Sequence, residues 1–508
     1  MIIDYNQKKD AIDISYVSET GQILVEEIIL DDEGYFEYVE CSDEDPNKIS
    51  NLKSFHGSSI KKEAAKYFKH HNVNEFFNTV LPTKYPKQFE KLNKLCLPNV
   101  YSLDIEVDLD PIWGWSPAQE AKNSIRSISI TDEKLNSILF IVKNPEHPEI
   151  NAIDIAYIDN IISEALTSKF NTQYDYEKQI RIFDTEIDML NVFLECFNKY
   201  FHLFIGWNIL DYDWQYIFNR CTNLGISIKK ASPTNKLGKK NIEINEKITI
   251  NLELPLHRLI TDYMLLFKES LVYNNLESYS LNNACIHILN IQKVEYEGNL
   301  GYLYKNDYLR YVAYAFVDTI LVMLLHKITK LLNVEFFQSY YTSVPYNRLS
   351  QMSISEALVF KELKKDNMFL LETEKTNNPG RKYKGGYVKA PTKKIINAGH
   401  GKDYGSLYPN SMITLGLSPE AKIDKILVDD DFNFINDNER QKWEKYKESG
   451  KYCLAPTGNI YDVSKDFLYT RIEKGLLNER KIFKGHMEDI YLNIIPKIEN
   501  EIKIKTNK

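Results

Sequence analysis

The stretch VYSLDIEV at Val100–Val107 decides the fold. Its apolar and β-branched residues predict a buried strand. Because alternate side chains of a strand point to the same side, Asp104 and Glu106 should face one common site. Carboxylate oxygens suit hard divalent cations, so this pair is a candidate metal site. Alone the spacing is weak evidence, because it recurs at Asp31/Glu33, Asp175/Glu177 and Asp184/Glu186.

Strand-like and helix-like segments alternate beyond this stretch, which predicts an α/β layered domain over residues 101–330. The expected strands are Ile125–Ile130 and Leu203–Gly206, and the expected helices are Glu186–Tyr200 and Trp214–Leu224. Residues 1–100 alternate short apolar runs with acidic turns, which predicts a small mixed N-terminal domain. Residues 331–370 are expected to return to that domain and to contain a helix over Ser353–Lys365.

The composition indicates an ordinary soluble globular protein, with 43% hydrophobic and 26% charged residues. The six cysteines are scattered without metal-ligand spacing, which argues against zinc and disulfides and favours a reducing cytoplasm. The apolar run Tyr311–Leu325 is too short for a membrane span and contains Asp318, so we expect a buried helix and no membrane. The net charge of −8 does not indicate nucleic-acid binding, although Lys361–Lys402 has a local surplus of Lys and Arg that a solvated linker would also explain.

Two further acidic positions could complete the candidate site. Asp213 opens the predicted helix after the strand Leu203–Gly206, and sites in α/β folds form at strand ends. The alternative is a carboxylate that only interacts with the helix dipole. Tyr314 and Asp318 are four residues apart in an apolar segment and share one helical face. A buried Asp there needs a metal, a cation or a proton, whereas a surface-edge Asp beside a core Tyr would need none.

The ordered series Asp-x-Glu, Asn-x(4)-Asp and Tyr-x(3)-Asp resembles the three exonuclease motifs of family B DNA polymerases. This resemblance implies an RNase H-like 3′-to-5′ exonuclease domain in which Asp104, Glu106, Asp213 and Asp318 ligate two Mg²⁺ or Mn²⁺ ions. It also implies that Tyr314 helps to position the attacking water and that Asn208 contacts DNA. The intervening residues Asp262–Phe267, Tyr279–Leu281, Lys293 and Tyr296–Gly298 are similar to the T-even bacteriophage branch of the family.

A second motif, DYGSLYP at Asp403–Pro409, resembles polymerase motif A of the same family. The resemblance implies that Asp403 and the Tyr404 carbonyl bind two catalytic Mg²⁺ ions and that Ser406 and Leu407 hold the triphosphate of a dNTP. Tyr408 would pack under the sugar and exclude a ribose 2′-hydroxyl by steric clash. Asn410 departs from the usual Ser, and residues 397–402 replace the usual apolar strand.

Two weaker segments flank motif A. Tyr383, Gly385 and Gly386 resemble the Tyr-x-Gly-Gly segment that touches template DNA in these polymerases. Arg480 and Lys484 share a helical face and resemble the residues of the first fingers helix that face the incoming triphosphate. A plain turn and a solvated basic face are the respective alternatives.

The resemblance divides the chain into four parts and ends before the polymerase is complete. The expected parts are the N-terminal domain, the exonuclease domain over 101–330, the first part of the palm over 371–470 and the first fingers helix over 471–508. Motifs B and C do not occur in the sequence. We therefore expect the N-terminal subunit of a split polymerase that acts on primer-template DNA with a second chain carrying motifs B and C and the thumb. That chain would share the two polymerase metals and could carry a sliding-clamp contact. The alternatives are a stand-alone 3′-to-5′ exonuclease and a non-catalytic DNA-binding assembly subunit.

Overall fold

The computed structural model describes residues 1–8, 11–30, 36–54, 59–64, 73–109, 114–167, 176–245, 248–270, 272–366, 368–369, 400–429 and 432–497. The chain forms two compact units, each built from two segments of sequence. The first contains residues 1–32 and 80–354, and the second contains residues 33–79 and 355–508. The four-part division expected from the sequence stays a prediction.

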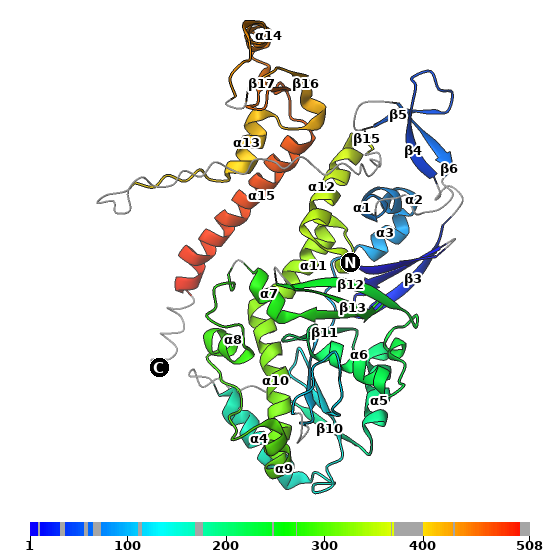
Figure 1. Ribbon diagram of the computed structural model, residues 1–508, viewed down its shortest axis with the longest axis vertical. Helices are drawn as coiled ribbons and strands as arrows, with labels where there is room; N and C mark the ends of the chain where they lie inside the picture. The colour runs from blue at the N-terminus through cyan, green and yellow to red at the C-terminus, as the bar shows by residue number, and fades with distance from the viewer. Residues whose placement is uncertain are drawn as a thin grey trace. The chain divides into compact units, whose positions relative to one another are not determined.

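The first unit is built around a six-stranded mixed sheet (Figure 1). Its spatial order is β10 (Lys178–Phe183), β9 (Ser137–Val142), β8 (Ile125–Asp132), β7 (Tyr101–Val107), β11 (Leu203–Gly206) and β14 (Leu259–Asp262). Strands β7, β8 and β9 are antiparallel neighbours, whereas β11 pairs in parallel with both β7 and β14. The predicted strand Val100–Val107 is thereby confirmed as a central strand of the sheet.

Helices cover both faces of this sheet, because successive strand residues point to opposite sides. Leu139, Ile141 and Ile205 belong to one core cluster with α4 (Ala152–Leu166) and α10 (Tyr308–Thr329). Phe140 and Phe204 belong to a second cluster with α5 (Glu186–Lys199) and α6 (Asp213–Asn223). The α/β layered architecture expected from the alternating segments is therefore confirmed.

Helix α10 is the central helix of this unit. It is long and apolar enough to cross a membrane by length and composition, but 89% of its most apolar window is buried inside the protein. Asp307 caps its first turn by accepting a hydrogen bond from the Arg310 amide, and the helix ends at Lys330 in a left-handed conformation. The prediction of a buried core helix is confirmed.

The remaining elements of the first unit surround this core. An antiparallel sheet contains β1 (Ile2–Gln7), β2 (Ala11–Val17) and β3 (Ile23–Ile29), and a hairpin contains β12 (Leu237–Asn245) and β13 (Ile248–Pro255). The other helices are α2 (Leu81–Lys84), α3 (Pro86–Leu92), α7 (Tyr263–Glu269), α8 (Leu281–Ile288), α9 (Leu300–Asn306) and α11 (Leu331–Thr342). Short 3₁₀ turns lie at Ile228–Ala231 and Tyr346–Arg348.

The described residues of the second unit form two small sheets and, beyond residue 400, three α-helices. One sheet has the order β15 (Met368–Phe369), β5 (Lys48–Ser54), β6 (Ser59–Ala64) and β4 (Phe36–Cys41), and the other has the order β16 (Lys422–Lys425), β18 (Asn459–Asp462) and β17 (Tyr452–Leu454). The helices are α13 (Leu407–Leu415), α14 (Asp437–Lys447) and α15 (Leu468–Asp489), which continues as a π-helical turn over Ile490–Ile494. The short helix α1 (Val73–Glu75) precedes a π-helical turn at Phe76–Val80, and a 3₁₀ turn lies at Pro419–Ala421.

The helix predicted over Ser353–Lys365 is present as α12 (Gln351–Lys365). Its C-terminal half belongs to the second unit, where Phe360 and Leu363 pack with Leu468 at the start of α15. Arg471 of α15 adds ion pairs to Glu362 and Asp366 at the end of α12. These contacts join the end of α12 to the base of α15.

Candidate active site

Three of the predicted acids meet where α10 crosses β7. Oxygens of Asp104, Glu106 and Asp318 lie within 4.8 Å of one another. Asp104 and Glu106 are two residues apart on β7 and therefore face the same side. Glu106 and Asp318 are buried, with 6% and 4% of their surfaces exposed. In the described part of the chain this is the one group of three such ligands that could hold a metal ion.

Asp213 approaches the same strand from the first turn of α6. Its Oδ1 accepts a hydrogen bond from the Ile105 amide at 3.1 Å, and Ile105 lies between the two acids of β7. The carboxylate is 4% exposed. It is not one of the three acids within 4.8 Å, so the structure places the fourth predicted acid beside the group and bound to its backbone.

A close turn between β11 and α6 sets the position of Asp213. A Cβ added to Gly206 would lie 2.7 Å from the Ile209 Cβ and 2.9 Å from the Leu103 carbonyl oxygen, so only glycine fits here. The Asp262 carboxylate accepts hydrogen bonds from the amides of Asn208 and Leu210 in this turn. It also accepts hydrogen bonds from the Met264 and Leu265 amides at the start of α7. These bonds fix the turn that delivers Asp213 to β7.

The four acids are crowded in a buried site, which makes their charged forms unfavourable. Burial, together with the Asp318 carboxylate, raises the pKa of Asp104 to about 7. Burial and neighbouring carboxylates also raise the pKa of Glu106 and of Asp213 well above their usual values. Burial raises the pKa of Asp318, and Lys293 partly opposes that effect. Such a group needs positive charge to remain ionised.

One positive charge comes from Lys293, a residue for which the sequence predicted no site role. Its Nζ lies 2.5 Å from Asp318 Oδ2 and donates a hydrogen bond to the Tyr314 hydroxyl at 2.8 Å. Although burial lowers the pKa of Lys293, the carboxylates of Asp318, Asp104 and Glu106 together outweigh burial and raise that pKa above its usual value. The available sequence signal was its place in the segment that resembles the phage polymerases.

The donor set fits a hard divalent cation. Asp318 Oδ1 is buried and has no hydrogen-bond partner among the described residues. Buried carboxylate oxygens without a donor are unfavourable unless a cation or a proton binds them. Since Lys293 neutralises one charge of several, the remaining oxygens of Asp104, Glu106 and Asp318 suit Mg²⁺ or Mn²⁺.

An aromatic pair lies next to the acids. Trp115 stacks on Tyr212, with ring centroids 5.1 Å apart and planes inclined by 15°. Trp115 is 57% exposed, and Tyr212 directly precedes Asp213. An exposed indole held flat beside an acidic site offers a stacking surface for a planar ligand such as a nucleobase. Asn208, the predicted DNA contact, lies in the neighbouring turn with φ 66°, and its role stays a prediction.

The motif A residues lie in the second unit, around the start of α13. Ser406 precedes the helix in a left-handed conformation with φ 51°, and Asn410 closes the turn by donating a hydrogen bond to the Gly405 carbonyl at 2.9 Å. Asp403 is exposed, as are Tyr404, Leu407 and Tyr408, of which 76%, 53% and 80% of the surface is accessible. Asn410 therefore takes a structural role where a Ser was expected. The predicted metal and nucleotide roles of this motif stay predictions.

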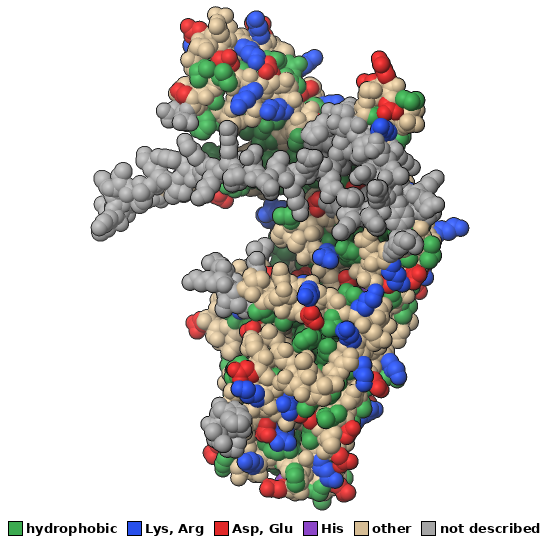
Figure 2. Space-filling view, turned by 45° about the vertical axis from the view of Figure 1, so that its right-hand side comes forward, with side chains coloured by type: hydrophobic (Ala, Val, Ile, Leu, Met, Phe, Trp, Pro, Cys, Tyr) green, Lys and Arg blue, Asp and Glu red, His purple; other side chains and the backbone are tan. Residues whose placement is uncertain are grey.

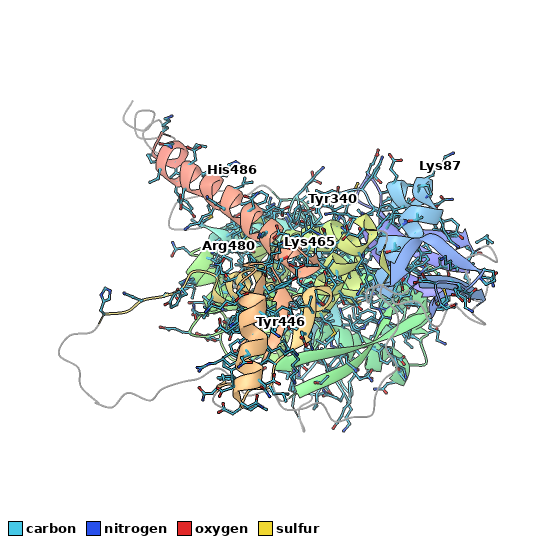
Figure 3. The ribbon with its side chains drawn as sticks, turned by 90° about the horizontal axis from the view of Figure 1, so that it is seen from above. Lys87, Tyr340, Tyr446, Lys465, Arg480 and His486 are labelled. Atoms are coloured by element: carbon cyan, nitrogen blue, oxygen red, sulfur yellow. The ribbon has the colours of Figure 1, made fainter. Side chains whose placement is uncertain are left out.

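The basic pair predicted to face a triphosphate lies on α15. Arg480 and Lys484 are exposed and one helical turn apart, and Arg480 extends from α15 in Figure 3. Lys484 Nζ lies 3.7 Å from the Glu488 carboxylate. The other predicted DNA-binding residues, Tyr383, Gly385 and Gly386, lie outside the described residues. Over the face seen in Figure 2, basic and acidic side chains are interspersed, in keeping with the absence of a net basic charge.

The sheet order and the acidic group define an RNase H-like domain with a candidate nuclease site. The antiparallel strands β9, β8 and β7 are followed by β11 and β14, which run parallel to β7. The acids lie on the central strand β7 and on α10, which crosses it. This architecture is the one that the sequence resemblance implied.

Comparison with known proteins identifies the domain further. Residues 49–284 match the family model described as DNA polymerase family B, exonuclease domain. The chain therefore carries an exonuclease domain of DNA polymerase family B. The matched residues include Asp104, Glu106 and Asp213 and end before α10.

Two curated relatives are bacteriophage polymerases. The chain is 27% identical over 314 residues to the DNA-directed DNA polymerase of Escherichia phage RB69. The aligned residues make up 60% of this chain and 33% of that protein. It is 26% identical over 324 residues to the DNA-directed DNA polymerase of Enterobacteria phage T4. Here the aligned residues make up 62% of this chain and 35% of that protein. The chain thus spans about a third of the length of these relatives.

Proposed function

We propose that the first unit is a 3′-to-5′ DNA exonuclease that uses two Mg²⁺ or Mn²⁺ ions. The observation that carries this proposal is the group of Asp104, Glu106 and Asp318, with Asp213 bonded to the backbone between the first two. These four carboxylates would hold the ions. When bound, two such ions activate a water molecule and stabilise the leaving 3′ oxygen.

The chain's own residues would orient the reactants. The Tyr314 hydroxyl accepts a hydrogen bond from Lys293, which fixes its oxygen beside Asp318, where it would help to position the attacking water. Trp115 and Tyr212 supply an aromatic surface for the terminal bases of a single strand. Lys293 also reduces the negative charge that would repel the phosphate backbone.

Degradation of single-stranded DNA carrying a 5′ label tests this function. We expect loss of nucleotides from the 3′ end with Mg²⁺, and no loss with EDTA. The double variant Asp104→Ala plus Glu106→Ala should lose this activity. Asp211→Ala is the matched control, because Asp211 lies in the same turn as Asp213 but outside the acidic group. Equal activity of the double variant and the control would contradict the assignment.

We further propose that the chain is the N-terminal subunit of a split replicative DNA polymerase. Motif A at Asp403–Pro409 supports this, because Asp403, Tyr404 and Tyr408 are exposed in the second unit and could receive a primer-template and a dNTP. In this proposal a second chain supplies the remaining metal ligands and the thumb, and that chain could also contact a sliding clamp. In the complete site, Asp403 would bind two Mg²⁺ ions.

Reconstitution with a polypeptide that carries motifs B and C tests this second proposal. Templated dNTP incorporation should appear only in the mixture, and Asp403→Ala should abolish incorporation while exonuclease activity stays unchanged. A folded complex that never incorporates dNTPs would leave the stand-alone exonuclease as the better description. That alternative has its own support, because the four acids all lie within the first unit.

A further inference from the structure

One face of α6 holds the loop of residues 114–124 by its backbone. Tyr216, Asn219, Arg220 and Asn223 follow one another at helical spacing and share that face. In that order they donate hydrogen bonds to the carbonyl oxygens of Asn123, Ala118, Lys122 and Glu120, at 2.8, 2.8, 2.7 and 2.9 Å. The loop joins β7, which carries two site acids, to β8.

Arg220 is the centre of this arrangement because it uses all five of its N–H donors. Two donate to the Glu186 carboxylate, at 2.9 and 2.7 Å. Three donate to the loop, at the carbonyl oxygens of Ala121 and Lys122 and at the Ser124 hydroxyl. The Arg220 and Glu186 side chains are only 12% and 11% exposed. Glu186 also accepts a hydrogen bond from the amide of Ile125, the first residue of β8. Lysine cannot reproduce this planar set of donors.

The held loop presents Trp115 to the candidate active site. Asn123 donates hydrogen bonds to the carbonyl oxygens of Asp108 and Gly114, both at 2.9 Å, and so ties the residue before Trp115 to the residue that follows β7. Trp115 follows Gly114 directly and stacks on Tyr212, the residue before Asp213. The position of Trp115 relative to the acids therefore depends on the contacts between α6 and the loop.

We propose that Arg220, held by Glu186, is a positioning residue that fixes Trp115 beside the acids for binding of a DNA 3′ end. This inference rests on the proposed exonuclease function. Arg220 acts through Trp115 and does not touch the reacting atoms. The loss of Arg220 should consequently weaken substrate binding more than it slows the chemical step.

The first experiment measures Trp115 in the full chain without DNA. Acrylamide quenching is recorded for the wild type, Arg220→Lys and Arg220→Gln, each with and without Trp115→Phe to isolate the Trp115 signal. We expect the quenching constant of Trp115 to rise roughly twofold in both Arg220 variants, because the loop opens locally. The matched control is Lys178→Met, which removes the ion pair with Asp159 elsewhere in the same unit. Unchanged Trp115 quenching in folded Arg220→Lys would overturn the proposal.

The second experiment separates binding from chemistry. For exonuclease action on single-stranded DNA, Arg220→Lys should raise KM about tenfold, the size of one lost base stack, while kcat stays within about twofold. A fall in kcat with unchanged KM would contradict a positioning role. If the wild type degrades no DNA, the proposed function fails, and the quenching result still decides whether Arg220 fixes the loop.

Discussion

The ammonium group of Lys293 lies 2.5 Å from Asp318 Oδ2, so a lysine is built into the group of three acids formed by Asp104, Glu106 and Asp318. The pair joins the segment before α9 to the middle of α10. Its side chains are 25% and 5% exposed, so the contact is largely shielded from water. This charge holds the acidic group together in the absence of ions.

Replacement of Lys293 by methionine should destabilise the metal-free protein by about 3 kcal/mol, because loss of one partner leaves a buried charge uncompensated. Mg²⁺ should then raise the melting temperature of Lys293→Met more than that of the wild type, since the ion replaces the missing charge. Thermal unfolding with EDTA and with Mg²⁺ measures both effects. Lys305→Met, which changes a lysine of α9 outside the acidic group, is the control. Equal Mg²⁺ shifts in the two variants would show that Lys293 does not compensate the acids.

Replacement of Asp104 by asparagine should have the opposite effect on stability. The raised pKa of Asp104, about 7, means that its ionised form is unfavourable in the folded protein. Asp104→Asn should therefore stabilise the metal-free protein by about 2 kcal/mol at pH 8 while abolishing Mg²⁺-dependent nuclease activity. Chemical denaturation with EDTA checks the first outcome. A less stable variant would mean that Asp104 has favourable contacts in the folded protein that outweigh repulsion.

His202 should make the first unit sensitive to acid. Burial and the nearby Arg258 lower the pKa of His202 from 6.5 to about 4. Below pH 6.5 His202 is protonated in the unfolded chain but stays neutral in the folded protein. The contribution of His202 to the free energy of unfolding is therefore fully present above pH 6.5 and is lost as the pH falls toward 4. The full loss is about 3 kcal/mol for this residue.

The variant His202→Asn separates this effect from general acid denaturation. The His202 ring accepts a hydrogen bond from the Ile23 amide at 2.8 Å through Nδ1, and an asparagine oxygen can accept it without titrating. Between pH 6.5 and 4 the variant should lose less stability than the wild type. His326, whose pKa burial also lowers to about 4, should account for part of the remaining slope. Identical slopes for the two proteins would exclude His202 as a source.

Gly206→Ala tests the turn that delivers Asp213. The added methyl group would lie 2.7 Å from the Ile209 Cβ, so the turn must move. We expect a loss of about 2 kcal/mol in the free energy of unfolding and a larger proportional loss of nuclease activity. Gly475→Ala in α15 meets no atom within 4 Å, so it should leave nuclease activity unchanged and should not lower the free energy of unfolding. Full activity of Gly206→Ala would show that the turn does not determine the position of Asp213.

The sequence predicted the parts of the site whose pattern is local. Alternation along β7 places Asp104 and Glu106 on one side, and the apolar run around Asp318 predicts a buried helix. The motif resemblance implied that Asp213 and Asp318 join them, although they lie far apart in the chain. Lys293, Trp115 and Arg220 were not predicted as site residues, because their roles depend on which distant residues pack against them. A lone lysine, tryptophan or arginine has no local pattern that distinguishes these positions from an ordinary surface.

Asp262 adds a fifth carboxylate near the acidic group, but its oxygens accept hydrogen bonds from the backbone. Four backbone amides from two separate turns already occupy its oxygens. It therefore cannot compete for an incoming cation, and the shape of the β11–α6 connection does not rely on one. If the site holds ions as proposed, the scaffold that carries Asp213 should keep its shape whether or not they are bound.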